Sequence, residues 1–297
     1  MAELAASAVP SIPPVVVGIG ADEDSRAAVR WAAAEAARRN VELVAVHVVS
    51  EQPRWSLARA STSRSGGVDS STSETRTARR MLTKVVELVG QEFPSVVVRT
   101  QLVAGDVAPV LGALSERAGL VVIGGKRQAL GRAGHLAGVL GGHGRSPLVV
   151  VHSDDNINGG PVVVGIDMGP EARHALDVAF DQASRMNVPL HVIHAIQRPM
   201  ADASTGVLVQ VGDQAAEEIK MTHSLVDGWR QQYPRLEVVE STHEGAAAQA
   251  LIDAAEGASM IVVGSHGRST LAALLLGSVS RTLVGRAPCP VAVVPSP

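Results

Sequence analysis

The chain has 297 residues, of which 46% are apolar and 2% aromatic, and a formal net charge of −3 at pH 7. This apolar fraction supports a substantial hydrophobic core and excludes a wholly disordered chain. The scarcity of aromatic side chains and the lack of excess positive charge argue against a protein that binds nucleic acid.

Strand and helix patterns alternate through the first half of the chain. We expect strands at Val15–Ile19, Glu42–Val49, Val96–Val103, Leu120–Gly124 and Leu148–Val151. We expect alanine-rich helices between them, at Asp24–Arg39, Thr75–Phe93, Val107–Arg117 and Leu136–Arg145. Valine runs without polar alternation are typical of strands buried on both faces, and strand–helix alternation gives a parallel sheet with right-handed crossovers.

The second half of the chain repeats the first. VVVGI at 15–19 returns at 162–166, and PLVV at 147–150 corresponds to PVAV at 290–293. The sequence therefore predicts an α/β fold with two homologous, doubly wound, open parallel five-stranded sheets that carry helices on both faces. We expect a tail at 1–14, domains at 15–152 and 161–297, and a polar linker at 153–160.

The N-terminus and the cysteine content bear on location. Met1–Pro14 has no basic region ahead of its apolar residues, unlike a signal peptide. No apolar run in the sequence approaches a length of about 18 residues, which a membrane helix needs. Cys289 is the single cysteine of the sequence, which excludes a disulfide framework and a cysteine-based metal cluster. We expect a cytoplasmic protein with neither a membrane nor a nucleic-acid partner.

The most informative motif is GSHGRST at 264–270, followed by Gly277, Ser278 and Val279. It has the spacing G-x2-G-x9-G-S and begins at the end of an apolar strand. The glycines let the backbone turn with its N–H groups exposed, and Gly277-Ser278 stands where the next helix should start, with serine a favoured N-cap. The pattern indicates a cradle for a polyphosphate, with an ordinary glycine-rich connection as the alternative.

The segment Gly264–Val294, the VVVGID run that ends at Asp167 and the LHVIHA run that contains His194 resemble the universal stress protein family. The resemblance covers nearly the whole chain in two copies, as in tandem members from actinobacteria. It implies a Rossmann-like fold and an ATP cofactor accompanied by Mg²⁺. The nucleotide-binding residues that it implies in the second half are Gly165, Asp167, Ala195, Gly264, Ser265, His266, Gly267, Arg268, Ser269, Thr270, Gly277, Ser278 and Val279.

Asp167 has two interpretations. The resemblance gives its carboxylate the ribose hydroxyls or the adenine edge, and places the backbone around Ala195 at the adenine. A carboxylate after the first strand is also a common device for ribose hydroxyls. From the residues alone, an Asx turn that caps the next helix is equally compatible.

The first half departs from the motif. Gly20 stands in the position of Asp167, Arg127 in that of Gly267 and Gly134 in that of Gly277, and the loop is shorter. We therefore expect a degenerate site. The residues that would still approach a nucleotide there are Gly18, Val48, Gly124, Lys126, Arg127 and Gly134.

The last strands of the two halves, Leu148–Val151 and Val291–Val294, are short and apolar, so we expect them at sheet edges. Family members commonly dimerise through this strand, and joined halves can satisfy the pairing within one chain. The resemblance also implies a homodimer of whole chains and unidentified regulatory protein partners.

The sequence offers no convincing catalytic group and no metal-ligand spacing. His47 and His194 occupy equivalent strand ends and are expected to be hydrogen-bonded core histidines. We therefore expect a regulatory protein of the stress response that binds ATP, and not an enzyme. The alternatives are a slow ATPase, a cyclic-nucleotide (cAMP) binder as known for some relatives, and an interaction protein with vestigial sites.

Overall fold

The computed structural model describes residues 12–20, 23–49, 70–126, 132–152, 155, 159–167, 169, 172–196, 211–265 and 276–295. The strands are β1 (Val15–Gly18), β2 (Leu43–Val49), β3 (Val98–Ala104), β4 (Leu120–Gly124), β5 (Leu148–Val151), β6 (Val162–Ile166), β7 (Leu190–Ile196), β8 (Val238–Glu244), β9 (Met260–Gly264) and β10 (Val291–Val294). The helices are α1 (Glu23–Arg39), α2 (Ser70–Glu92), α3 (Val107–Ser115), α4 (Arg132–His143), α5 (Ala172–Met186), α6 (Val211–Gln232), α7 (Ala247–Ala254) and α8 (Ser278–Arg286). The expected α/β fold with two tandem domains is confirmed.

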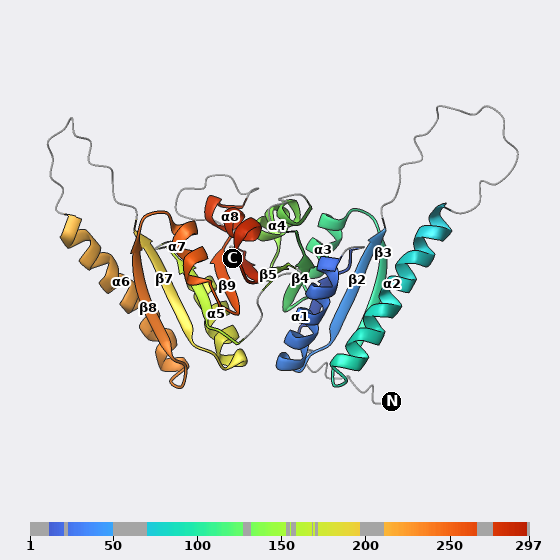
Figure 1. Cartoon of the computed structure of the whole chain (residues 1–297), viewed down its shortest axis with the longest axis horizontal. Coiled ribbons are helices and arrows are strands. Elements are labelled where there is room, and N and C mark those ends of the chain that lie inside the picture. Colours follow the sequence, from blue (N-terminus) through green and yellow to red (C-terminus); the bar gives the residue numbers. More distant parts are fainter. Residues whose placement is uncertain are drawn as a thin grey trace, which may run out of the picture.

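The two halves share one sheet of ten strands, in the order β3-β2-β1-β4-β5-β10-β9-β6-β7-β8 (Figure 1). Each half contributes five parallel strands. The halves meet where β5 and β10 pair antiparallel, with Val150 opposite Val291 and Leu148 opposite Val293. The expected pairing of the last strands within one chain is confirmed. It moves both strands from the edges of two sheets to the centre of a single sheet.

The helices divide between the two faces of this sheet (Figure 1). Helices α1, α2, α5 and α6 cover one face, where Ala28, Leu82, Leu176 and Val226 join one buried cluster with alternate strand residues such as Val15 and Val17. Helices α3, α4, α7 and α8 cover the other face, where Leu111, Leu140, Leu251 and Leu283 pack with Val16. Successive valines thus face opposite layers, which explains why the strands are apolar throughout.

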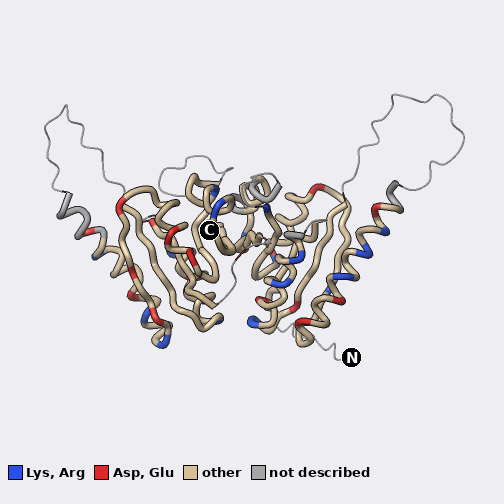
Figure 2. Tube along the Cα trace, viewed as in Figure 1, with Lys and Arg blue, Asp and Glu red and all other residues tan. Residues whose placement is uncertain are grey.

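Charged residues lie mainly on the helices and at the ends of the strands, and the middle of the sheet is largely free of them (Figure 2). One charged group is nevertheless completely buried. Glu35 of α1 has no exposed side-chain surface and pairs with Arg38 and Arg39 one turn further along the helix. Arg39 also approaches Asp181 of α5 at 3.6 Å, so this cluster lies at the contact between the two halves.

Two helices begin earlier than the sequence indicates. Helix α2 begins at Ser70 instead of near Thr75, and α4 at Arg132 instead of near Leu136. Serine, threonine and glycine are weak helix formers, so the first turns of both helices read as loop. The apolar residues that follow in each helix pack on the sheet and override that local preference.

Candidate functional site

The carboxyl ends of β9, β6 and β7 meet at one edge of the second-half sheet. Gly165 of β6 lies opposite Val263 of β9 and, on its other side, opposite Ile193 of β7. Ser265, Asp167 and Ala195 therefore follow one another along this edge, with Asp167 in the middle. In an open parallel sheet this edge is where ligands bind.

Asp167 begins the connection from β6 to α5 and is half-buried. Its Oδ1 accepts a hydrogen bond of 3.0 Å from the backbone N–H of Gly169. The Asx turn that the sequence left open is thus present, and it fixes the carboxylate at the edge of the sheet.

Helix α8 opens onto the same edge. Gly277 is its N-cap residue, and no side chain of the described residues caps this helix end. The expectation that Ser278 is the N-cap is therefore wrong by one residue, since Ser278 is the first residue of the helix and is exposed. The first N–H groups of a helix have no acceptor within the helix, so this end presents donors suited to an anion.

Ser265 joins the end of β9 to α8. Its N–H donates to the carbonyl of Val294 at 2.8 Å, and its own carbonyl accepts from the N–H of Gly277 at 2.8 Å. Ser280 adds its hydroxyl, which lies 3.2 Å from the carbonyl of Ser265 and 3.1 Å from that of Gly277. These contacts fix the start of α8 relative to the strand. Ser280 is not among the residues predicted from the sequence, where its signal is a second serine two positions after Ser278.

Gly165 has a packing reason to be glycine. A Cβ atom there would come within 2.6 Å of the Leu251 side chain on α7. At the equivalent Gly18 of the first half, the nearest atom would lie at 3.4 Å, on Ile123. Gly165 therefore lets α7 approach β6 closely. His266, Gly267, Arg268, Ser269 and Thr270 lie outside the described residues.

The first half builds its edge differently. Gly20 has no carboxylate, and its N–H donates to the Ser25 hydroxyl at 2.8 Å, so Ser25 holds the turn that Asp167 holds in the second half. Gly124 ends β4, Lys126 is exposed, and Val48 is a half-buried residue of β2. Arg127 lies outside the described residues.

Gly134 does not match Gly277 in position. Helix α4 starts at Arg132, so Gly134 lies inside the helix and not at its N-cap. Residues 125–131 join β4 to α4, whereas the longer segment 265–277 joins β9 to α8. The alignment that pairs Gly134 with Gly277 is anchored on the last strand of each half. It puts Gly134 at a helix start because it does not account for α4, which extends further towards its N-terminus than α8.

The paired histidines at the strand ends are structural. His47 Nδ1 lies 2.8 Å from the carbonyl of Ile19, and His194 Nδ1 lies 3.2 Å from that of Ile166. The predicted hydrogen bonds are confirmed for both histidines, and the predicted burial for His194, whereas His47 is half-buried. Within the described part of the chain, His, Cys, Asp and Glu side chains form no group of three or more that could hold a metal ion.

Similarity to known sequences identifies the family of this chain. A sequence model of the universal stress protein family matches residues 12–152 and 160–295, one copy in each half. The chain belongs to the universal stress protein family. A universal stress protein of Mycobacterium tuberculosis is 33% identical over 287 residues, which cover 94% of this chain and 96% of that protein.

One solved structure shares this fold over nearly the whole chain. A universal stress protein from Archaeoglobus fulgidus aligns with a TM-score of 0.65 at 17% identity, over 95% of this chain and 98% of that one. A universal stress protein in complex with cAMP aligns with 45% of this chain and 95% of its own, at 26% identity and a TM-score of 0.35. No helix among the described residues has the length and apolar character needed to span a membrane.

Proposed function

We propose that the second half of this universal stress protein binds ATP, with Mg²⁺ on the phosphates, at the carboxyl edge of β9, β6 and β7. The observation that carries the proposal is the uncapped start of α8 at Gly277, on the edge where Asp167 follows β6. A helix N-terminus with exposed amides suits a phosphate, and a carboxylate at the end of the first strand suits ribose hydroxyls.

In this proposal the N–H groups of Ser278 and Val279 donate hydrogen bonds to phosphate oxygens. The Asp167 carboxylate accepts hydrogen bonds from the ribose hydroxyls, and the backbone at Ala195 contacts the adenine. The residues from His266 to Thr270 complete the phosphate cradle, as the family motif implies. Mg²⁺ is held chiefly by the phosphates and water, the usual arrangement for this ion in nucleotide sites.

We assign the bound nucleotide a regulatory role in the stress response, with no enzymatic turnover. Helices α8 and α4 lie on the same face and contact each other across the β5–β10 pair (Figure 1). A phosphate bound at the start of α8 therefore acts on an element that touches the other half. Occupancy of one site thus changes the surface that both halves offer to regulatory partners in the cytoplasm.

The first prediction concerns stoichiometry. Calorimetric titration with MgATP is expected to give about one site per chain, because Gly20 lacks a carboxylate and Gly134 lies inside α4. Equal tight binding at two sites would contradict the asymmetry between the halves. Mass spectrometry of the nucleotide released from denatured protein identifies the ligand. Release of cAMP instead of ATP would mean that the site binds cAMP.

The second prediction concerns hydrolysis. Phosphate release from ATP is expected to stay below about one per second, the lower end for typical enzymes, because the sequence offers no P-loop lysine and no general base. A malachite-green assay on fresh protein, with Gly277→Glu as background, measures it. Faster release that the substitution abolishes would place the protein among the ATPases.

The third prediction concerns assembly. We propose a homodimer of whole chains as implied by the family. Since β5 and β10 already pair with each other, this dimer has to use another surface. Light scattering is expected to give twice the chain mass of 30.7 kDa. A strictly monomeric mass would contradict the proposed homodimer. It would not affect the pairing of β5 with β10 within the chain.

A further inference from the structure

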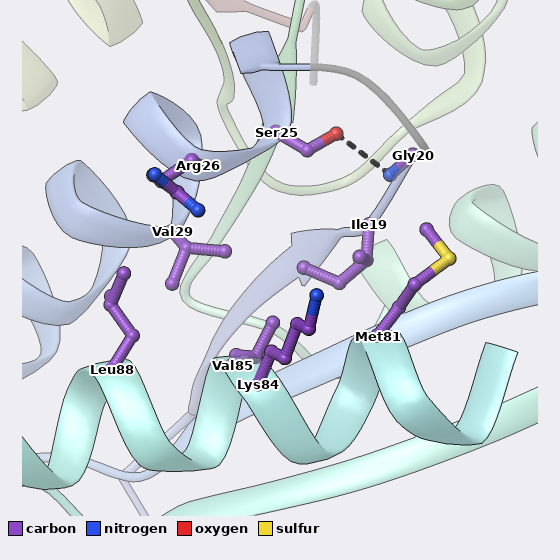
Figure 3. A pocket seen from close by; sticks show the side chains of 9 residues that line it. All are labelled: Ile19, Gly20, Ser25, Arg26, Val29, Met81, Lys84, Val85 and Leu88. Carbon is purple, nitrogen blue, oxygen red and sulfur yellow. Dashed lines mark hydrogen bonds between the residues drawn. The ribbon is translucent and has the colours of Figure 1, made fainter. Parts of the chain in front are cut away.

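A cavity of about 220 Å³ lies in the first half, between α1, α2 and the carboxyl end of β1 (Figure 3). Its apolar wall consists of Ile19, Val29, Met81, Val85 and Leu88. It lies on the face of the sheet covered by α1 and α2, whereas α8 covers the opposite face. Its volume is below the roughly 300–1,000 Å³ of sites for drug-sized ligands, so it suits a molecule smaller than ATP.

Two basic side chains complete the lining, Arg26 from α1 and Lys84 from α2. Figure 3 shows the Lys84 side chain rising from α2 towards Ile19, with Arg26 on the facing helix. Among the residues whose side chains the structure describes, no acidic group lines the cavity, and none forms an ion pair with either cation. The cavity therefore combines an apolar wall with two positive charges that form no ion pair with the described side chains.

The acidic group whose charge acts on this region is already paired. Glu92 at the end of α2 accepts hydrogen bonds from Arg30 Nε at 2.9 Å and from Arg30 Nη2 at 2.7 Å. The hydrogen bonds from Arg30 hold the pKa of Glu92 below its usual range, so this carboxylate stays ionised and bound to Arg30. Arg30 thus binds Glu92 directly, whereas Arg26 attracts the same carboxylate through its charge alone and forms no ion pair with it, which leaves Arg26 available to a ligand.

The second half lacks this combination. Aligning Phe93-Pro94 with Tyr233-Pro234 places Ser224 at the position of Lys84. The repeat of VVVGI places Asp167 at the position of Gly20. At each of these two lining positions the first half is more positive by one charge, although beside them it carries Asp22 and Glu23 where the second half has Gly169 and Pro170. The loss of the carboxylate and the gain of the lysine therefore act in the same direction on the lining itself.

We propose that this cavity binds a small amphiphilic anion, with its apolar body against the α1–α2 wall and one carboxylate or phosphate between Arg26 and Lys84. This site is independent of the ATP site assigned to the second half. Apolar burial supplies most of the affinity, because both cations are exposed and their contacts are screened by solvent.

The test uses octanoate and octyl phosphate as anionic probes, with octanol as the neutral probe of the same chain length. Binding is followed by the shift of the ¹³C-labelled Met81 methyl group, which lines the cavity. Arg26→Gln or Lys84→Ser is expected to weaken octanoate about threefold and the double variant about tenfold, with octanol unchanged. Raising the salt concentration is expected to weaken the anions alone.

The matched control is Arg173→Gln, the position equivalent to Arg26 in the second half, which is expected to leave octanoate binding unchanged. Octanoate binding that neither Arg26→Gln nor Lys84→Ser weakens would overturn the proposal, as would octanol binding equal to octanoate in every variant. Displacement of octanoate by ATP would mean that the cavity binds a nucleotide, and this would also overturn the proposal. A stronger response to octyl phosphate than to octanoate supports a phosphate ligand.

Discussion

Replacing Gly277 with glutamate is expected to abolish measurable ATP binding by the full-length chain while leaving the fold intact. The new carboxylate would lie at the start of α8, where the phosphates are proposed to meet the helix amides. Loss of two or three charge-assisted contacts costs on the order of 3–6 kcal/mol, or at least about 100-fold in affinity. The backbone at Gly277 has φ −56° and ψ 159°, which any residue adopts without strain, so the variant should fold.

The matched control is Gly228→Glu, which adds the same charge to the same half. Gly228 lies on α6, and a Cβ atom there would meet nothing within 4 Å. Calorimetry should show normal ATP binding for this variant, and circular dichroism should show native folding for both. Normal ATP affinity in folded Gly277→Glu protein would mean that the phosphates do not bind at α8.

Replacing Glu35 with alanine is expected to lower the free energy of unfolding by about 2–4 kcal/mol. The Glu35 side chain is completely buried, whereas those of Arg38 and Arg39 are 29% and 17% exposed. Removal of the carboxylate takes the buried partner from both partly buried guanidinium groups and leaves Arg39 only the more distant Asp181, at the contact between α1 and α5. Urea denaturation measures the loss.

Glu92→Ala is the comparison variant for this stability experiment. It removes the carboxylate of an exposed pair, in which the side chains of Arg30 and Glu92 are 45% and 38% exposed. A much smaller loss than for Glu35→Ala is therefore expected, because solvent screens an exposed pair. Glu35→Gln should fall between the two, because Gln182 occupies the equivalent buried position on α5. Equal losses for Glu35→Ala and Glu92→Ala would show that burial of the Glu35 pair is unimportant.

Much of the fold follows from local patterns. The valine runs of β1, β4 and β5 are apolar throughout because both faces of each strand are covered, and this pattern is legible in the sequence. The repeat also predicted that β5 and β10 pair. The starts of α2 and α4 could not be predicted, since tertiary packing extends both helices through residues that do not favour a helix by themselves.

The candidate site was predictable in position and less so in detail. The order of the strands brings Asp167 and the start of α8 to one edge, as the alternation of strands and helices implies. The N-cap shifted from Ser278 to Gly277 because Gly277 is anchored by its hydrogen bond to Ser265. That contact joins segments far apart in the motif, so the spacing of glycines does not reveal it. The Ser25 turn was missed for the same reason.

Because the two halves that pair through β5 and β10 belong to one chain, the covalent connection determines which halves associate. A short tether holds its two ends at an effective concentration of roughly millimolar, so each half meets its covalent partner before any free one. Separate half-proteins would pair at random. Some pairs would then consist of two first halves, with Gly20 in both and no acidic residue at that position. Fusion fixes the composition of every molecule at one half with Gly20 and one with Asp167. Mutations could therefore accumulate in the first half without producing assemblies in which both halves lack the carboxylate.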